Sequence, residues 1–211
     1  MNFGKLLTAL ISLFIIGGCG AGAVREVPIS LRYLPSKEAK FAPLAGLNTV
    51  GLGLIEDVRR KRPAGAVGER VRFTAEIDRF HPEKGVSGAV EKIIRGYFTK
   101  RSVRVLKSAW NGNPDNIWGK KGDLVLSVRV LALWFSGSDS VALARASSTF
   151  RIELKVGSPR TGTVIIKTIQ IDPSARRNIF WESRDVELWI SRSISEAFDR
   201  ILPGLGRRLV G

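Results

Sequence analysis

The chain has 211 residues, enough for one domain with a substantial core, and its single cysteine cannot form an internal disulfide. Its 34 lysines and arginines and 19 aspartates and glutamates give a net charge of +15 at pH 7. This charge predicts attraction to anionic lipid headgroups, lipopolysaccharide phosphates, acidic wall polymers or an acidic protein, although basic residues can also serve only to keep a surface solvated. One histidine supports neither a catalytic triad nor a metal site, so we expect no metal and no cofactor.

The first twenty residues have the layout of a lipoprotein signal peptide. Lys5 gives a short positive region, and the apolar run at residues 6–16 has about the length of a signal-peptide core. A transmembrane helix needs about 20 apolar residues, so this run is too short to span a bilayer. Cys19 follows Ile16 and two glycines, the pattern that lipoprotein signal peptidase recognises. We expect cleavage between Gly18 and Cys19 and lipid attachment to the Cys19 thiol; the alternative is a buried thiol in a signal anchor.

These features divide the chain into three parts. Residues 1–18 are the expected signal peptide, residues 19–26 the lipidated cysteine with a flexible tether, and residues 27–211 one periplasmic domain. Gly20 stands where an inner-membrane retention signal would place aspartate. Sorting therefore favours the periplasmic face of the outer membrane over the inner membrane.

The mature chain begins with two predicted strands, at residues 27–34 and 47–55. The densest charge run follows them and consists of Arg59, Arg60, Lys61 and Arg62. Pro63 places this run in an exposed loop or hairpin tip before residues 71–77. The run is the first candidate for binding an anion, and a solvated loop is the alternative interpretation. His81 is predicted to lie in a turn beside Pro82.

From residue 86 the apolar period becomes that of a helix facing a core. Its predicted buried residues are Val86, Ala89, Val90, Ile93, Ile94, Tyr97 and Phe98. A strand at 103–106 and an irregular loop at 108–122 come next. Trp110 and Trp118 make this loop the candidate ligand-binding loop, because tryptophans among amides can stack on sugar rings; the alternative is that they cover the end of a sheet.

Long alternating strands are predicted at 123–135 and 146–156, separated by a turn at 136–140. A third strand is expected at 163–171 and a short fourth at 178–181. Asp185 then caps an amphipathic helix that Pro203 and Gly204 end or kink, and Arg207 and Arg208 form a basic tail. The predicted fold is α+β, an antiparallel sheet of about five to seven strands with two amphipathic helices packed on one face.

Several of these patterns together resemble the YajG-type family of bacterial envelope lipoproteins. They are the Cys19 motif, an early strand, the helix ending in Gly96-Tyr97-Phe98, the stretch at 122–128 and the closing helix. The chain is more distantly similar to auxiliary lipoproteins of envelope transport systems. The resemblance implies the fold and an envelope location, and it transfers no functional residue. The run at 59–62 has no place in that family.

No pair of carboxylates and no nucleophile motif stands out for catalysis, so we expect no enzyme. The sequence predicts a lipid-anchored periplasmic protein that acts as a non-catalytic adaptor or accessory subunit of a cell-envelope assembly. The alternative is a module that binds an anionic envelope component, namely lipopolysaccharide, phospholipid or wall polymer, through its basic surface. The expected partners are the membrane, through the N-terminal lipid, and an envelope protein or an anionic lipid or polymer, and not nucleic acid.

Overall fold

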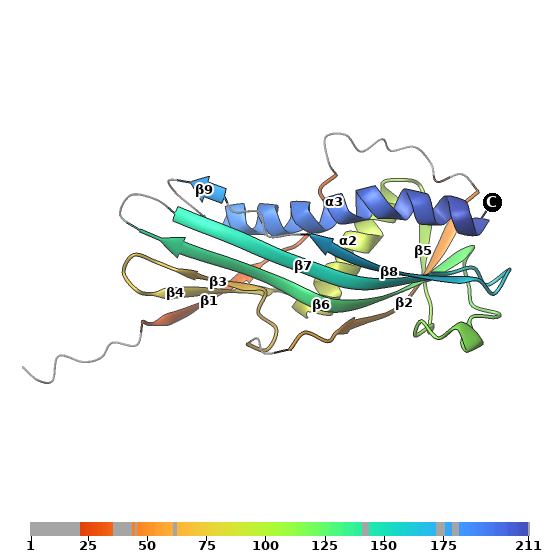
Figure 1. Ribbon diagram of the computed structural model, residues 1–211, viewed down its shortest axis with the longest axis horizontal. Helices are drawn as coiled ribbons and strands as arrows, with labels where there is room; N and C mark the ends of the chain where they lie inside the picture. The colour runs from red at the N-terminus through yellow and green to blue at the C-terminus, as the bar shows by residue number, and fades with distance from the viewer. Residues whose placement is uncertain are drawn as a thin grey trace, which may run out of the picture.

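The computed structural model describes residues 22–35, 44, 46–60, 63–140, 144–171, 176–178 and 182–210. Within these ranges the chain forms one open sheet with two long helices against it (Figure 1). The strands are β1 (Val24–Ile29), β2 (Thr49–Asp57), β3 (Gly68–Val71), β4 (Ile77–Pro82), β5 (Arg104–Lys107), β6 (Leu124–Asp139), β7 (Ala144–Gly157), β8 (Val164–Ile171) and β9 (Arg176–Asn178). The helices are α2 (Gly85–Thr99), the short 3-10 turn η1 (Pro114–Asn116) and α3 (Ser183–Val210).

The β6–β7 hairpin is the axis of the sheet. β6 and β7 pair antiparallel along their lengths, with one bulge between Val130 and Ala132. The other edge of β6 pairs first with β2 and then with β3. β5 extends the sheet beyond β2, β4 and β1 extend it beyond β3, and β8 and β9 pair with β7. The molecule is elongated, with strands β3, β4 and β1 at one end of β6 and strands β2 and β5 at the other (Figure 1).

The predicted α+β class, with two helices packed on one face, is confirmed. The strand directions differ from the prediction, because the pairs β1–β4, β2–β5, β2–β6 and β3–β6 are parallel, and the described strands number nine. Alternation of apolar and polar residues reports which faces of a strand are buried, and it does not report the direction of the neighbouring strand. Direction follows from the connections, and the parallel partners are joined by long ones: β2 and β5 are connected through β3, β4 and α2, and β1 and β4 through β2 and β3.

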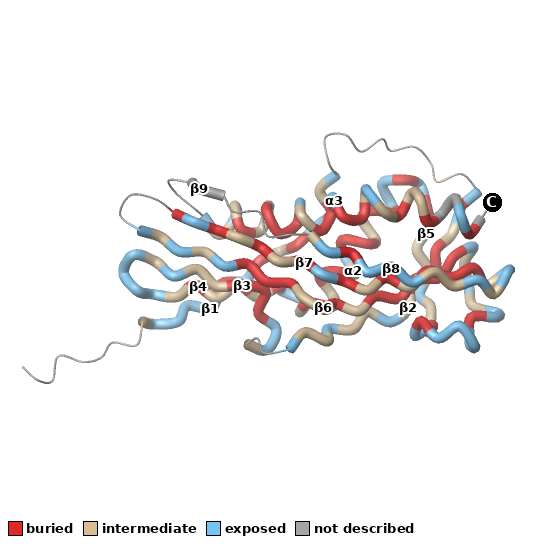
Figure 2. Tube along the Cα trace, in the orientation of Figure 1, coloured by how far each residue is buried: buried red, intermediate tan, exposed pale blue. Residues whose placement is uncertain are grey.

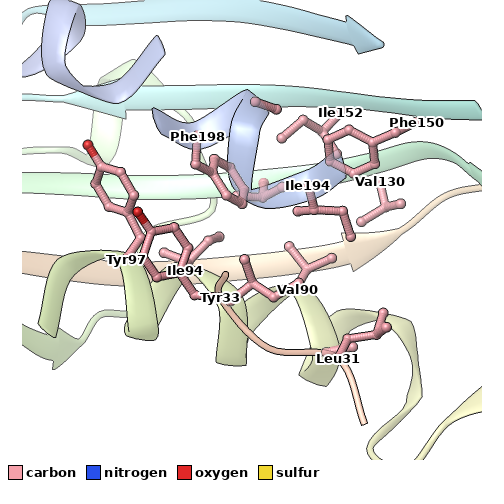
Figure 3. Packing of buried hydrophobic residues seen from close by; sticks show 14 of the residues in the cluster. Leu31, Tyr33, Val90, Ile94, Tyr97, Val130, Phe150, Ile152, Ile194 and Phe198 are labelled. Atoms are coloured by element: carbon pink, nitrogen blue, oxygen red, sulfur yellow. The ribbon is translucent and has the colours of Figure 1, made fainter. Parts of the chain in front are cut away.

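Helix α2 is as the sequence predicted. Its buried side chains are the seven expected ones, and they face the sheet and α3. In the core, Val90 and Ile94 of α2 lie opposite Ile194 and Phe198 of α3, with Phe150 of β7 behind them (Figure 3). Buried residues line the middle of the long strands and the inner sides of the helices (Figure 2).

Helix α3 differs from the prediction at both ends. It begins at Ser183, and the Asp185 carboxylate accepts a hydrogen bond from the Glu182 backbone N–H at 2.8 Å, so Asp185 lies inside the first turn. Pro203 does not end the helix, which continues to Val210. The apolar contacts of buried Leu205 and Leu209 outweigh the hydrogen bond that proline removes. Residues 207–208 therefore belong to the helix and not to a tail.

Other element boundaries shift as well. The first strand begins at Val24, which shortens the predicted tether, and it ends at Ile29. Residues 136–139 extend β6, although a turn was expected there. Residues 72–76 form the turn of the β3–β4 hairpin. His81 lies within β4, where its cross-strand partner is Pro28 of β1, and its imidazole Nε2 lies against the Glu26 carboxylate. The short fourth strand is found at 176–178, and residues 179–181 lie outside the described residues.

Candidate functional site

The basic run at 59–62 is not a uniform surface patch. The Arg59 side chain is only 5% exposed. Its guanidinium binds the Asp57 carboxylate at 2.7 and 2.8 Å and donates to the carbonyls of Ala66 and Leu133 at 2.7 and 2.9 Å. These contacts hold the loop after β2 against β6. Arg60 is exposed, while residues 61 and 62 lie outside the described residues.

Arg59 also sets the acidity of its partner. Burial raises the pKa of Asp57, but the hydrogen bonds and positive charge of Arg59 outweigh that effect and hold the pKa below its ordinary value. A carboxyl whose pKa is lowered by folding stabilises the folded state above its unfolded pKa. That contribution is lost as the pH falls through the folded pKa.

Replacing Arg59 should therefore destabilise the protein in a way that depends on pH. We expect Arg59→Ala to lower the free energy of unfolding by about 1.5–3 kcal/mol at neutral pH, because charged hydrogen bonds are lost and two carbonyls lose their donor. The difference from the wild type should begin to shrink below about pH 4, the ordinary pKa of an aspartate, and should go on shrinking until Asp57 is protonated in the folded protein at a lower pH. Urea unfolding of both proteins at neutral pH and at a pH well below about 4 measures this difference in the free energy of unfolding. Arg60→Ala is the control, and an equal loss in the two variants would contradict this role.

The two candidate tryptophans have different environments. Trp110 is fully buried, donates its indole N–H to the Asn113 carbonyl at 2.8 Å, and packs on the outer face of the sheet with Ile117 and Val125. It covers the sheet, which was the alternative interpretation of this loop. Trp118 is 62% exposed and lies over Gly162, where a Cβ atom would come within 2.4 Å of the indole ring. Trp118 is thus the one tryptophan of the pair that a ligand could reach.

The remaining predicted features are placed as follows. Cys19 and Gly18 lie outside the described residues, which begin at Gly22. None of the helices in the described ranges is long and apolar enough to cross a membrane. The described residues also contain no cluster of three or more His, Cys, Asp or Glu side chains arranged to hold a metal ion.

A small apolar pocket opens between the second half of α3 and the sheet. Its lining residues are all apolar: Leu44, Leu47, Val50, Phe98, Leu124, Leu126, Val156, Leu202 and Leu205. Such a lining offers contact area and no hydrogen bond to orient a polar substrate.

A polar seam joins residues 30–34 to α3. Backbone N–H groups of Ser30, Arg32 and Leu34 donate to the side chains of Glu187, Ser191 and Ser195 at 3.0, 3.2 and 2.9 Å. Two residues of extended chain advance about 6.6 Å and four residues of helix about 6.0 Å, so every second N–H meets every fourth side chain. On the other side, Lys92 of α2 donates to the Ser30 hydroxyl at 2.8 Å. The segment therefore runs between the two helices.

The seam ends in a buried ionic cluster of Tyr33, Tyr97, Arg101 and Asp199. Arg101 donates to the Asp199 carboxylate at 2.9 Å and to the Tyr33 hydroxyl at 3.0 Å, and Tyr33 also hydrogen-bonds Asp199. The guanidinium carbon lies 3.8 Å from the centre of the Tyr97 ring. Burial, reinforced by the hydrogen bond to Asp199, raises the pKa of Tyr33 to about 12. Burial likewise raises the pKa of Tyr97.

Removing the cation of this cluster should be costly. The side chains of Arg101 and Asp199 are 2% and 8% exposed, so Arg101→Ala leaves a carboxylate buried without its counter-charge. We expect a loss of about 3–5 kcal/mol in the free energy of unfolding, measured by urea denaturation. Lys100→Ala, which changes the exposed neighbour, should stay within about 0.5 kcal/mol of the wild type. Similar values for the two variants would show that the cluster does not join the helices.

The exposed surface consists of the outer face of the sheet and its free edge, which is the edge of β8 that pairs with no other strand among the described residues. Arg129 of β6 lies 3.7 Å from Glu56 of β2 and 3.3 Å from Glu153 of β7, which makes a charge ladder across three strands. At the edge, Ile166, Lys167 and Thr168 of β8 are all exposed. Successive side chains of a strand point to opposite faces, so neither face of β8 is covered there.

Sequence reasoning missed the Arg101 cluster and the exposed hairpin end of the sheet. In the sequence, Arg101 follows Lys100 and resembles any solvent-exposed charge. Its partner Asp199 is distant in the chain, so no local pattern indicates that Arg101 is buried. Phe73 could have been found, because a large apolar residue in a turn between two strands is unusual. It is 74% exposed at the tip of the β3–β4 hairpin.

No protein-family model matches the sequence, and neither does the sequence of any curated protein. Among solved structures, the chain is similar to protein XCC0632 from Xanthomonas campestris, described under the family model DUF330. The TM-score is 0.51 at 9% sequence identity, over 87% of this chain and 95% of that chain. At this identity the similarity shows the fold alone. The chain thus has the open α+β fold of that protein.

Two further structures have lower scores. A putative neuraminyllactose-binding hemagglutinin homolog from Helicobacter pylori has a TM-score of 0.36 at 14% identity, over 84% of this chain and 92% of that one. Lipoprotein GNA1162 from Neisseria meningitidis has a TM-score of 0.36 at 9% identity, over 71% of this chain and 96% of that one. At these scores neither structure supports an argument about this chain, and the YajG-type resemblance stays a prediction.

Proposed function

We propose that the protein is a lipid-anchored, non-catalytic accessory subunit or adaptor of a cell-envelope assembly, held at the periplasmic face of the outer membrane through Cys19. The free edge of β8 carries this proposal. An exposed strand edge presents backbone N–H and C=O groups with which a partner strand can pair. The YajG-type resemblance supports the same kind of protein.

The residues at this edge indicate the chemistry of the partner. Ile166 is 53% exposed and gives an apolar contact on the outer face of β8. Lys167 lies on the opposite face of the strand and is also exposed. Lysine on an edge strand discourages pairing between identical chains. A partner strand would suit this edge if it carried an acidic side chain opposite Lys167 and an apolar side chain opposite Ile166.

The ends of the molecule lie far apart, which suits an adaptor. β6 has sixteen residues and spans about 50 Å. The start of β1 lies beside the hairpin end of the sheet, whereas the loop at 108–122 lies at the other end (Figure 1). An anchor at Cys19 would therefore fix one end near the membrane and hold the other end away from it.

Crosslinking of the native lipoprotein with an amine-reactive reagent tests the partner surface. We expect mass spectrometry to find Lys167 joined to an envelope protein, because Lys167 lies in the middle of the free edge. Ile166→Arg should reduce that crosslink several-fold by placing a second cation beside it. Leu54→Arg is the matched control, since Leu54 is an apolar side chain of β2 that is 45% exposed.

Two results would contradict the proposal. One is a monomeric protein in crosslinked envelopes, with no partner retained through purification. The other is a Cys19→Ser chain that still fractionates with membranes as a processed lipoprotein, which would show that Cys19 does not carry the lipid anchor.

The alternative function is binding of an anionic envelope component, and the surface of α3 favours it. Arg184, Arg192, Arg200 and Arg208 are exposed on this helix and form no ion pair with another described residue. Exposed cations without counter-charges attract phosphate groups over about a Debye length.

Salt-sensitive binding to lipopolysaccharide or to phosphatidylglycerol vesicles tests this alternative. We expect charge reversal of Arg60, Lys61 and Arg62 to glutamate to weaken binding of the Cys19→Ser chain, provided that Arg59 is kept for its structural contacts. Reversal of Arg192 and Arg200 is the matched comparison on the helical face. Unchanged binding after both reversals would dispose of the alternative function, and equal losses would show a diffuse charge effect instead of a site at the run.

A further inference from the structure

Three of the six large apolar side chains that the described residues expose lie at the hairpin end of the sheet. Phe73 is 74% exposed in the turn between β3 and β4, and Val24 and Val71 are 45% and 44% exposed. Val24 of β1 and Val71 of β3 are both cross-strand partners of Ile77 in β4. Direct partners point to the same face, so Val24, Ile77 and Val71 form a continuous apolar row next to the turn. Figure 2 shows the exposed tip of this hairpin.

The same end receives the chain from Cys19. Gly22 lies against the hairpin turn, and a Cβ atom there would come within 1.8 Å of the Ala75 carbonyl oxygen. The Ile77 N–H also donates to the Ala23 carbonyl at 3.0 Å. Two residues lie between Cys19 and Gly22, and a fully extended chain covers at most about 11 Å over these three Cα-to-Cα steps. A lipid attached to Cys19 would therefore enter the bilayer no more than about 11 Å from Gly22.

Two arginines beside the turn can meet lipid phosphates. Arg25 and Arg72 share one buried carboxylate, Asp78, at 2.8 and 2.9 Å. The two arginine side chains are 57% and 32% exposed, and Asp78 is 2% exposed. Exposed Glu76 of the same turn balances the second positive charge, so the group has no net charge and offers phosphate only the two exposed guanidinium groups. Arginine beside an aromatic side chain suits the interface, where the ring enters the headgroup region and the cation faces phosphate.

We propose that the turn of the β3–β4 hairpin is a second membrane contact, with the Phe73 ring inserted into the lipid interface beside the acylated Cys19. This inference rests on the proposed lipid anchor. The headgroup region on each side of a bilayer is about 5–7 Å thick, so a turn held this close to the anchor can reach it. One exposed phenylalanine is ordinary on a protein surface. Phe73 differs because it lies beside the apolar row of Val24, Ile77 and Val71 and next to the segment that leads from Cys19 into β1.

The single native cysteine makes the contact measurable. In Phe73→Cys the acylated Cys19 is blocked, so the new thiol is unique and takes an environment-sensitive fluorophore. The full-length lipoprotein is reconstituted into phosphatidylethanolamine–phosphatidylglycerol vesicles, with or without bromine on the acyl chains. We expect the label to shift to shorter wavelength on reconstitution and to lose intensity with brominated chains. Trp118→Cys, an exposed aromatic position at the other end, is the control and should show neither change.

The outcomes separate the hairpin contact from the anchor. The mass of the N-terminal peptide reports acylation of Cys19 independently of the fluorophore. An acylated protein whose label at 73 is quenched no more than the label at 118 overturns the hairpin contact and leaves the anchor intact. A protein without acylation overturns the anchor, and the quenching at 73 in a Cys19→Ser background, where the label is again unique, then decides the contact. Val71→Cys gives a second position in the apolar row, and its label should also be quenched.

Discussion

The fold depends on the extended segment at 30–34 that runs between α2 and α3. A buried backbone must have its N–H groups paired, and this segment has left the sheet, so it takes acceptors from the side chains of α3. Because the repeats of strand and helix nearly match over this distance, three successive bonds form without distortion. The Arg101–Asp199 pair then joins the end of α2 to α3 at the end of the seam. Together these contacts fix α3 across the sheet, which apolar packing alone would leave free to slide.

The seam also determines how a force on the amino terminus would enter the molecule. The chain pairs along the whole of β1 with β4 before it reaches the helices. A pull at Cys19 would thus act on a parallel strand ladder first and on the seam next, and both must open before the core is exposed. Under the proposed anchor, this arrangement would make the segment that follows the lipid part of the fold. The shortened tether has the same consequence, since β1 already begins at Val24.

Much of the fold could be predicted because its signals are local. The period of α2 identified every one of its buried residues, and alternation located β6 and β7 within a few residues of their observed ends. The directions of the strands could not be predicted, since alternation is the same in parallel and antiparallel strands. The roles of Ser191 and Ser195 could not be predicted either, because the backbone N–H groups that they accept from lie more than 150 residues earlier in the chain. The basic run shows the same limit, because one of the contacts that bury Arg59 is to the carbonyl of Leu133, which is distant in the chain.

The distribution of charge connects the two exposed ends of the molecule. At the hairpin end most arginines have acidic partners, as in the Arg70–Asp139 and Arg79–Glu69 pairs. On α3 the exposed arginines have none among the described residues, and Arg208 lies near the carboxyl end, far from the start of β1 (Figure 1). Electrostatic attraction in physiological salt decays over about 8 Å. Under the proposed anchor, a molecule about 50 Å long that stands on its hairpin end keeps Arg208, near the end of α3, beyond the reach of the membrane's charge, whereas the start of α3 lies nearer the hairpin end (Figure 1). The charge of Arg208 is then available to an acidic partner, and lipid contact at the hairpin rests on the short-range apolar residues there.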